Sequence, residues 1–197
     1  LDPAPEQLRA AVEAGADMVL THHPLAMRPA WTNALNGYTD VLSILYRNDV
    51  PLYASHTTLD ANPLGPSAWL PDLLGLADRV ILEKTGTFTA PDGTQTEGGF
   101  GCAGTLPAPM SLKKLCAAMR GSLPLDRMCA VPRLIGNPDM TVRRVAVCTG
   151  SGSSLMEEAA AAGADLFITG DVKYHDALAL ASRHDGRSPN FCSMAIL

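Results

Sequence analysis

Short apolar runs alternate with stretches of helical periodicity along this chain. Apolar residues that recur every three or four positions predict helices, and short continuous apolar runs bounded by turn residues predict buried strands. Alternation of the two predicts an α/β fold with mixed sheets flanked by helices. We expect helices over 5–14, 38–48, 69–75, 111–119 and 154–162, and strands over 18–21, 50–55, 80–89, 98–106, 126–131, 142–148 and 166–169.

One segment of this pattern occurs twice. Residues 13–23 read EAGADMVLTHH, and residues 161–171 read AAGADLFITGD. In both, a helix end is followed by Gly-Ala-Asp, three apolar residues, a threonine and a polar pair. Gly-Ala-Asp is a common connector between a helix and a strand, so chance similarity is the alternative. The match covers the whole unit, however, and it favours two similar lobes.

The repeat predicts a first α/β lobe over residues 1–90 and a second part over 91–197, with the repeated lobe at about 140–197. We expect a cleft shared by the lobes, because ligands of open α/β sheets lie beyond the carboxyl ends of the strands. The histidines that end the first copy would then face the polar residues that end the second. The chain begins Leu-Asp-Pro, and we expect a further strand before it.

Two adjacent histidines, His22 and His23, follow the apolar residues 18–20 and Thr21. Neighbouring side chains of a strand point to opposite faces, so two core histidines in a row are hard to satisfy. Where a strand opens into a loop, both rings can turn toward one cleft. Because imidazole is a common ligand for Zn, Fe, Cu and Ni, we predict that both histidines bind metal. Hydrogen-bonded or exposed histidines are the alternative.

His56 and Asp60 follow a second apolar run, residues 50–55. If the chain turns helically after this run, the two side chains share a face, because they are four residues apart. A carboxylate beside an imidazole is a common mixed ligand set for Zn, Fe or Mn. We predict Asp60 as a metal ligand and His56 as a residue that supports the ligands or carries a proton. The alternative is that Asp60 only forms the turn before residues 61–63.

A third polar cluster, residues 169–176, follows the last clear predicted strand. Its members Asp171 and His175 are four residues apart and could act as a general base with its orienting partner, or contact the substrate. We therefore count Asp171 and His175, with His56, as candidate catalytic residues. The alternative is a helix N-cap at Asp171 beside an exposed His175.

The glycine-rich loop 149–154 lies between a predicted strand and a predicted helix, where backbone amides could cradle an anion. Leu155 stands where the dinucleotide fingerprint needs a third glycine or alanine, and the loop lacks the Gly-Lys-Ser/Thr of a P-loop. A tight turn is the simpler interpretation. Contact with an anionic substrate, as in a nucleotide-binding or sugar-phosphate-binding module, is the alternative.

Composition narrows the classes of function. The chain has 197 residues, 47% apolar and 18% charged, which suits one compact domain or two small fused lobes. A net charge of −5 with no basic run disfavours duplex nucleic acid as a partner. No apolar stretch reaches the ~18 residues of a membrane span, and no signal peptide is evident. Five cysteines without a C-x-x-C pair predict buried thiols in the reducing cytoplasm.

These motifs together resemble the NGG-interacting-factor-three-like proteins, whose bacterial members are called GTP cyclohydrolase I type 2 homologues or dinuclear-metal-centre hexameric proteins. The resemblance rests on Gly-Ala-Asp at 15–17, Thr-His-His-Pro-Leu at 21–25, the His-Thr and Leu-Asp pairs within 56–60, and Thr-Gly-Asp-Val-Lys-Tyr-His-Asp at 169–176. It covers nearly the whole chain. It implies two similar α/β lobes, a toroidal homo-hexamer and two divalent ions (Zn, Fe or Mn) per subunit, with His22, His23 and Asp60 as ligands.

The resemblance also implies a metal-dependent hydrolase of a nucleotide-like or heterocyclic substrate, and it suggests opening of the guanine imidazole ring of GTP with release of formate. Water activated by two ions would attack a ring carbon, and His56 or His175 would move the proton. Near its C-terminus the family has Gly-His and a Glu four residues later, but here no Glu follows Glu158 and no His follows His184. This departure favours a second hypothesis, a metal-binding scaffold or partner-binding protein without catalysis.

Overall fold

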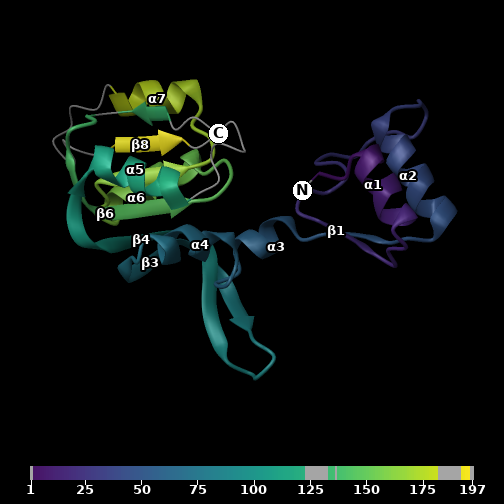
Figure 1. Ribbon diagram of the computed structural model, residues 1–197, viewed down its shortest axis with the longest axis horizontal. Helices are drawn as coiled ribbons and strands as arrows, with labels where there is room; N and C mark the ends of the chain where they lie inside the picture. Colours follow the sequence, from purple (N-terminus) through teal and green to yellow (C-terminus); the bar gives the residue numbers. More distant parts are fainter. Residues whose placement is uncertain (1, 123–132, 136, 182–191, 196–197) are drawn as a thin grey trace. The chain divides into compact units, whose positions relative to one another are not determined.

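The computed structural model describes residues 2–122, 133–135, 137–181 and 192–195. The predicted strand over 126–131 lies outside this part of the chain, as does His184. Packing divides the chain into two compact units, Leu1–Leu59 and Asp60–Leu197, each with a sheet of its own (Figure 1).

The first unit combines two helices with a pair of short strands. Its elements are α1 (Pro5–Glu13), β1 (Val19–Thr21), α2 (Gly37–Asn48) and β2 (Leu52–Ala54). The start of α2 is fixed by Asn36, whose side chain accepts hydrogen bonds from the amides of Tyr38 at 3.0 Å and Thr39 at 3.2 Å. Leu8 of α1 and Val41 of α2 are buried, which anchors the apolar side of each helix in the unit.

The two strands of the first unit run parallel, and Thr21 at the end of β1 lies opposite Ala54 at the end of β2. The Ser55 amide donates to the carbonyl of Thr21 at 3.0 Å, which continues the pairing one residue beyond β2. Because parallel strands end at the same edge of a sheet, the residues that follow β1 and β2 begin side by side.

The second unit contains a six-stranded mixed sheet of strand order β3-β4-β6-β7-β8-β5. Elements from the unit boundary onward are α3 (His56–Asp60), α4 (Pro66–Leu73), β3 (Ala77–Thr89), β4 (Gln95–Ser111), α5 (Leu112–Ser122), β5 (Arg133–Ile135), β6 (Thr141–Cys148), the 3-10 turn η1 (Ser153–Leu155), α6 (Met156–Ala161), β7 (Leu166–Thr169), α7 (Tyr174–Ala181) and β8 (Cys192–Ala195). β6, β7 and β8 run parallel, and the other pairings are antiparallel. None of the helices in the described ranges has the length and apolar character that a bilayer crossing needs.

Two apolar clusters lie on opposite faces of this sheet. One contains Leu166 and Ile168 of β7 with Leu115 of α5, and the other contains Phe167 of β7 with Ala159 of α6. β7 is therefore buried on both faces, which explains why its sequence is a continuous apolar run and not an alternating one. The prediction of an α/β fold with mixed sheets flanked by helices is confirmed.

The repeated segment forms the same local structure in both copies. The residue after the C-cap of α1 is Gly15 with φ 77°, and the residue after the C-cap of α6 is Gly163 with φ 75°. In the first copy the Ala16 amide donates to Ala11 at 3.0 Å, and in the second the Ala164 amide donates to Ala159 at 3.1 Å. Both ends are Schellman motifs, in which glycine supplies the left-handed residue that leads into the strand.

Packing places the unit boundary elsewhere than the expected division at residue 90. β3 pairs with β4 from Ala77 to Thr89, so these residues belong with the second unit. The division into lobes of 1–90 and 91–197 concerns the internal repeat and stays a prediction. The structure also adds α7 and β8, which follow the last strand expected from the sequence.

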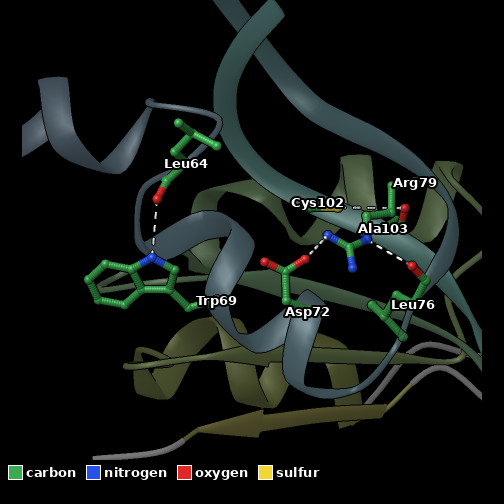
Figure 2. Close-up of polar contacts among 7 residues, drawn as sticks. All are labelled: Leu64, Trp69, Asp72, Leu76, Arg79, Cys102 and Ala103. Carbon is green, nitrogen blue, oxygen red and sulfur yellow. Dashed lines mark hydrogen bonds and ion pairs between the residues drawn. The ribbon is translucent and has the colours of Figure 1, made fainter. Parts of the chain in front are cut away.

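Figure 2 shows how α4 is tied to the start of β3. Arg79 pairs with Asp72 of α4 at 2.5 Å through Nη1, and its Nε donates to the carbonyl of Leu76 at 2.8 Å. The register of β3 against β4 shifts just before Val80, and Asp78 has φ 48°, so the strand carries a β-bulge here.

Burial of the thiol of Cys148, at the end of β6, gives a testable pH dependence of stability. Burial, with the nearby carboxylates of Asp60 and Glu83, raises the pKa of Cys148 from its ordinary 9.0 to about 11. The unfolded chain loses this proton first, so the thiol's contribution is complete below pH 9 and is lost as pH rises through the folded pKa near 11. At one pKa unit per 1.36 kcal/mol, the contribution is at most about 3 kcal/mol.

Urea unfolding between neutral and alkaline pH checks this expectation when wild type is compared with Cys148→Ala. The variant should lack the component of the stability loss that belongs to the thiol, while lysine and tyrosine titrations affect both proteins alike. Parallel pH profiles of wild type and variant would contradict the burial argument.

Candidate metal site

Three histidines of the first unit converge where its two strands end. His22 and His23 follow β1, and His56 follows β2 after Ser55. Each ring offers one nitrogen, and these three nitrogens lie within 4.8 Å of one another. The ring centroids are 4.9 Å apart for His22 and His23, 5.4 Å for His22 and His56, and 5.7 Å for His23 and His56. The parallel strand pair thus turns two separate sequence motifs into one cluster.

Hydrogen bonds to the backbone carbonyls of His22 and His23 hold the loops of this cluster in place. The His56 amide donates to the carbonyl of His22 at 2.9 Å, so the two loops are joined directly at the histidines. The hydroxyl of Thr21, which is buried, donates to the carbonyl of His23 at 2.8 Å. His56 itself has φ 28°, in the left-handed region that is costly for a residue with a Cβ. Strain of this kind concentrates at functional sites.

Asp2 belongs to the cluster, and sequence reasoning missed it. Its Oδ1 is hydrogen-bonded to Nδ1 of His23. This hydrogen bond, helped by attraction to the rings of His23 and His22, holds the pKa of Asp2 below its ordinary value. A carboxylate on one ring nitrogen fixes the tautomer and leaves the other nitrogen as an acceptor, as second partners of metal-binding histidines do. The sequence signal was weak, because Asp2 lies in a Leu-Asp-Pro segment that reads only as a chain end.

The donor set of the three histidines fits a divalent transition metal. Neutral imidazoles suit Zn, Fe, Cu and Ni, and nitrogens bound at about 2.1 Å to one tetrahedral ion are roughly 3.4 Å apart. The three nitrogens lie within 4.8 Å of one another, so binding of one ion would draw them closer together. His22 and His56 are half-buried and His23 is exposed, so a ligand has access from one side.

Asp60 lies at the end of α3, one helical turn after His56, so the expected helical turn after Ser55 is present. Its carbonyl accepts a hydrogen bond from the hydroxyl of Ser67 at 2.5 Å, which fastens the end of α3 to α4. Asp60 is counted with the second unit, whereas the three histidines lie in the first. Its role as a metal ligand stays a prediction.

Asp171 and His175 lie in the second unit, and both are exposed. Asp171 follows β7, whereas His175 is in the first turn of α7, where its ring contacts that of Tyr174 with centroids 5.6 Å apart. Because α7 begins at Tyr174, Asp171 is too early to be its N-cap, so that part of the alternative is wrong, whereas His175 is exposed as the alternative expected. The catalytic roles of Asp171 and His175 stay predictions.

The glycine-rich loop after β6 is a tight turn packed on the end of β7. The Gly152 amide donates to the hydroxyl of Thr169 at 2.9 Å, and that hydroxyl donates to the carbonyl of Gly150 at 2.9 Å. A side chain at position 152 would meet Cys148 Sγ at 2.6 Å, which is why glycine is needed there. One amide of the loop is thus already used within the protein, which favours the tight-turn interpretation.

Comparison with known proteins identifies the family and agrees with the fold. Residues 1–185 match the family model of Duf34/NIF3 (NGG1p interacting factor 3). The chain belongs to this family. It is 35% identical over 178 residues to a GTP cyclohydrolase 1 type 2 homolog of Streptomyces coelicolor, covering 89% of this chain and 59% of that protein. A protein of the same name from Clostridium perfringens is 31% identical over 178 residues, covering 89% of this chain and 63% of that protein. The chain therefore spans about three fifths of the length of these relatives.

Solved structures share the fold of this Duf34/NIF3 chain. Staphylococcus aureus protein SA1388 matches with a TM-score of 0.78 and 23% identity, over 99% of this chain and 72% of that one. A Bacillus cereus protein related to NIF3 matches with a TM-score of 0.77 and 21% identity, over 99% of this chain and 76% of that one. The family resemblance expected from the histidine motifs is confirmed.

Proposed function

We propose that this chain binds a divalent metal ion through His22, His23 and His56 and acts as part of a metal-dependent hydrolase of a nucleotide or other heterocyclic substrate. The convergence of three imidazole nitrogens within 4.8 Å carries the proposal. The relatives named GTP cyclohydrolase 1 type 2 homolog support the substrate class. Asp60 is the proposed oxygen ligand, and the resemblance adds a second ion per subunit.

Each residue of the cluster has a distinct task in this proposal. The imidazoles supply the ligand nitrogens, and Asp2 holds the ring of His23 in one tautomer. Thr21 fixes the backbone that carries His23. A divalent ion in this position supplies a Lewis acid that makes water nucleophilic near neutral pH. His175, with Asp171 to orient it, is proposed to move the proton.

His56 has two possible tasks, and the geometry favours one of them. The sequence suggests that it carries a proton, but its ring nitrogen lies within 4.8 Å of those of His22 and His23. We therefore propose His56 as a third ligand. The two tasks differ in their consequences, since loss of a ligand weakens metal binding and loss of a proton carrier slows turnover only.

Elemental analysis of the purified protein, followed by GTP turnover assays with Mn, Fe and Zn, tests the proposed function. We expect bound metal and release of formate from GTP, or hydrolysis of a related nucleotide. Metal-replete protein that turns over no nucleotide would support the metal site and contradict the hydrolase activity. This is the result expected of a metal-binding scaffold. Protein that binds none of the three metals would contradict both.

The proposal also includes a homo-hexamer in the cytoplasm, as the family resemblance implies. Reduced cysteines support the compartment, since Cys102, Cys116 and Cys148 form no disulfide within the described chain. Light scattering on the purified protein measures the assembly directly.

A further inference from the structure

Two adjacent glycines of β4, Gly98 and Gly99, lie against the turn that follows Asp60. The Gly99 amide donates to the carbonyl of Ala61 at 2.9 Å, and Ala61 is buried. A glycine inside a strand often marks a place where another backbone approaches closely. Here the approaching backbone is that of Ala61. The β3–β4 hairpin therefore contacts the chain one residue after a proposed metal ligand.

The space around Gly98 explains why this position has no side chain. A Cβ on Gly98 would lie 2.5 Å from the carbonyl oxygen of Ala61 and would also overlap the ring of Phe88. The φ of Gly98 lies outside the left-handed region, so alanine can adopt the same backbone conformation. Close contact, and not backbone conformation, therefore requires glycine at position 98.

A β-bulge in β3 lies directly opposite these glycines. Lys84 pairs with Gly99, but the next pair along the hairpin is Gly86 with Gly98, so Thr85 is an extra residue on β3. A bulge bends the strand that carries it, and such bends often lie beside functional sites. Beyond this point the hairpin extends away from the rest of its sheet (Figure 1). The two glycines thus lie at the bend where the hairpin leaves the sheet.

The turn after Asp60 is held on its other side as well. The carbonyl of Asp60 accepts a hydrogen bond from the hydroxyl of Ser67 at 2.5 Å, and the side-chain oxygen of Asn62 accepts one from the amide of Leu64 at 2.9 Å. Two consecutive carbonyls, those of Asp60 and Ala61, are thus bonded to α4 and to β4 respectively. A backbone fixed in this way restricts where the carboxylate of Asp60 can lie, as a preorganised ligand requires.

We propose that Gly98 and Gly99 are positioning residues for Asp60. They allow the Ala61 carbonyl to bind against β4, and this contact holds the carboxylate of Asp60 where it can bind metal. The inference rests on the proposed function, in which Asp60 is the oxygen ligand. It assigns a role to the glycines of β4 that the ligand residues alone do not explain.

Gly98→Ala and Gly86→Ala form a matched pair for the test, since the two glycines lie directly opposite each other in the hairpin. A Cβ on Gly86 meets nothing within 4 Å, and the φ of Gly86 is also outside the left-handed region. We expect Gly98→Ala to raise the Kd for Zn²⁺ about tenfold or more, as loss of a residue that supports a ligand does. Gly86→Ala should bind Zn²⁺ like wild type. Competition titration against a chromophoric chelator measures both.

A double-mutant cycle with Asp60→Ala separates positioning from a general structural effect. If Gly98 acts through Asp60, Gly98→Ala should cost no further affinity once Asp60→Ala is present. A general effect on the fold would weaken binding in both backgrounds and would overturn the inference.

The same cycle distinguishes the inference from the proposed function. If Asp60→Ala binds Zn²⁺ as tightly as wild type does, Asp60 is not a ligand, and both the ligand assignment and the inference are wrong. If Asp60→Ala weakens binding but Gly98→Ala does not, the ligand assignment is supported and the positioning role is wrong.

Phe88→Ala provides a second comparison if Gly98→Ala alone does not fold. Combined with Phe88→Ala, Gly98→Ala no longer overlaps the ring but still meets the carbonyl of Ala61. The double variant should bind Zn²⁺ about tenfold or more weakly than Phe88→Ala does. Equal affinities of these two variants would contradict the positioning role.

Discussion

His22→Ala is expected to lower the affinity for Zn²⁺ by more than 100-fold. Removing a partner behind a ligand already costs about 10–100-fold in metal affinity, and His22 is proposed to bind the ion itself. Its ring is central in the cluster, with centroids 4.9 Å from His23 and 5.4 Å from His56. The alanine also leaves the strand pairing intact, because His22 joins the neighbouring loop through its backbone carbonyl. Competition titration against a chromophoric chelator measures the affinity.

Three further variants distinguish residues that bind the metal from residues that only support its ligands. Asp2→Asn removes the charge beside His23 and should cost about 10–100-fold, less than a lost ligand. His56→Ala should match His22→Ala if His56 is a ligand, and should retain metal if it only carries a proton. His175→Ala should retain metal in either case. If His22→Ala binds Zn²⁺ as tightly as wild type does, the proposed site is wrong.

The sequence predicts the cluster well because a simple rule governs it. His22 and His56 each follow a short apolar run, and parallel strands end at one edge. The side-chain positions of His22 and His23 could not come from strand alternation, since both residues lie beyond Thr21, where β1 ends. Their convergence depends on the loop that Thr21 and the His56 amide stabilise. The contact of the His56 amide with the carbonyl of His22 is long-range, and a local pattern does not encode it.

The role of Asp2 could not be predicted from local sequence patterns. A carboxylate 21 residues from His23 in the sequence becomes its hydrogen-bond partner only after the unit folds. No periodicity or motif marks that pair. Asp171 and His175 show that residues four positions apart need not share a helix, because α7 begins only at Tyr174 and Asp171 lies before it. A spacing rule holds only when both residues lie in the same element.

The repeat was recognisable from sequence because its constraint is local. Gly15 and Gly163 both need a left-handed backbone at the end of a helix, and the residues after them must enter a strand at once. The unit boundary depends instead on the pairing of β3 with β4. The sequence of a strand alone does not determine which strand it pairs with. β8 was missed for a related reason, because its four residues acquire strand structure by lying between β7 and β5.

Leu166→Ala should reduce the free energy of unfolding of the second unit by about 2–5 kcal/mol, as deletion of a fully buried leucine side chain does. Leu166 is 0% exposed and belongs to the cluster that joins β6 and β7 to α5. Leu64→Ala is the matched control, because Leu64 is 82% exposed in the same unit and should change stability by less than about 0.5 kcal/mol.

Urea unfolding followed by the fluorescence of Trp69, in a Trp31→Phe background, makes this comparison specific, since Trp69 belongs to α4 of the second unit and Trp31 to the first. The difference between the two leucine variants tests the packing directly, because the same side-chain atoms are removed in both. If the two variants unfold at the same urea concentration, β7 does not lie in the core as described. A large loss for Leu166→Ala alone would show that β7, the strand before Thr169 and Asp171, is held by packing on the face that meets α5.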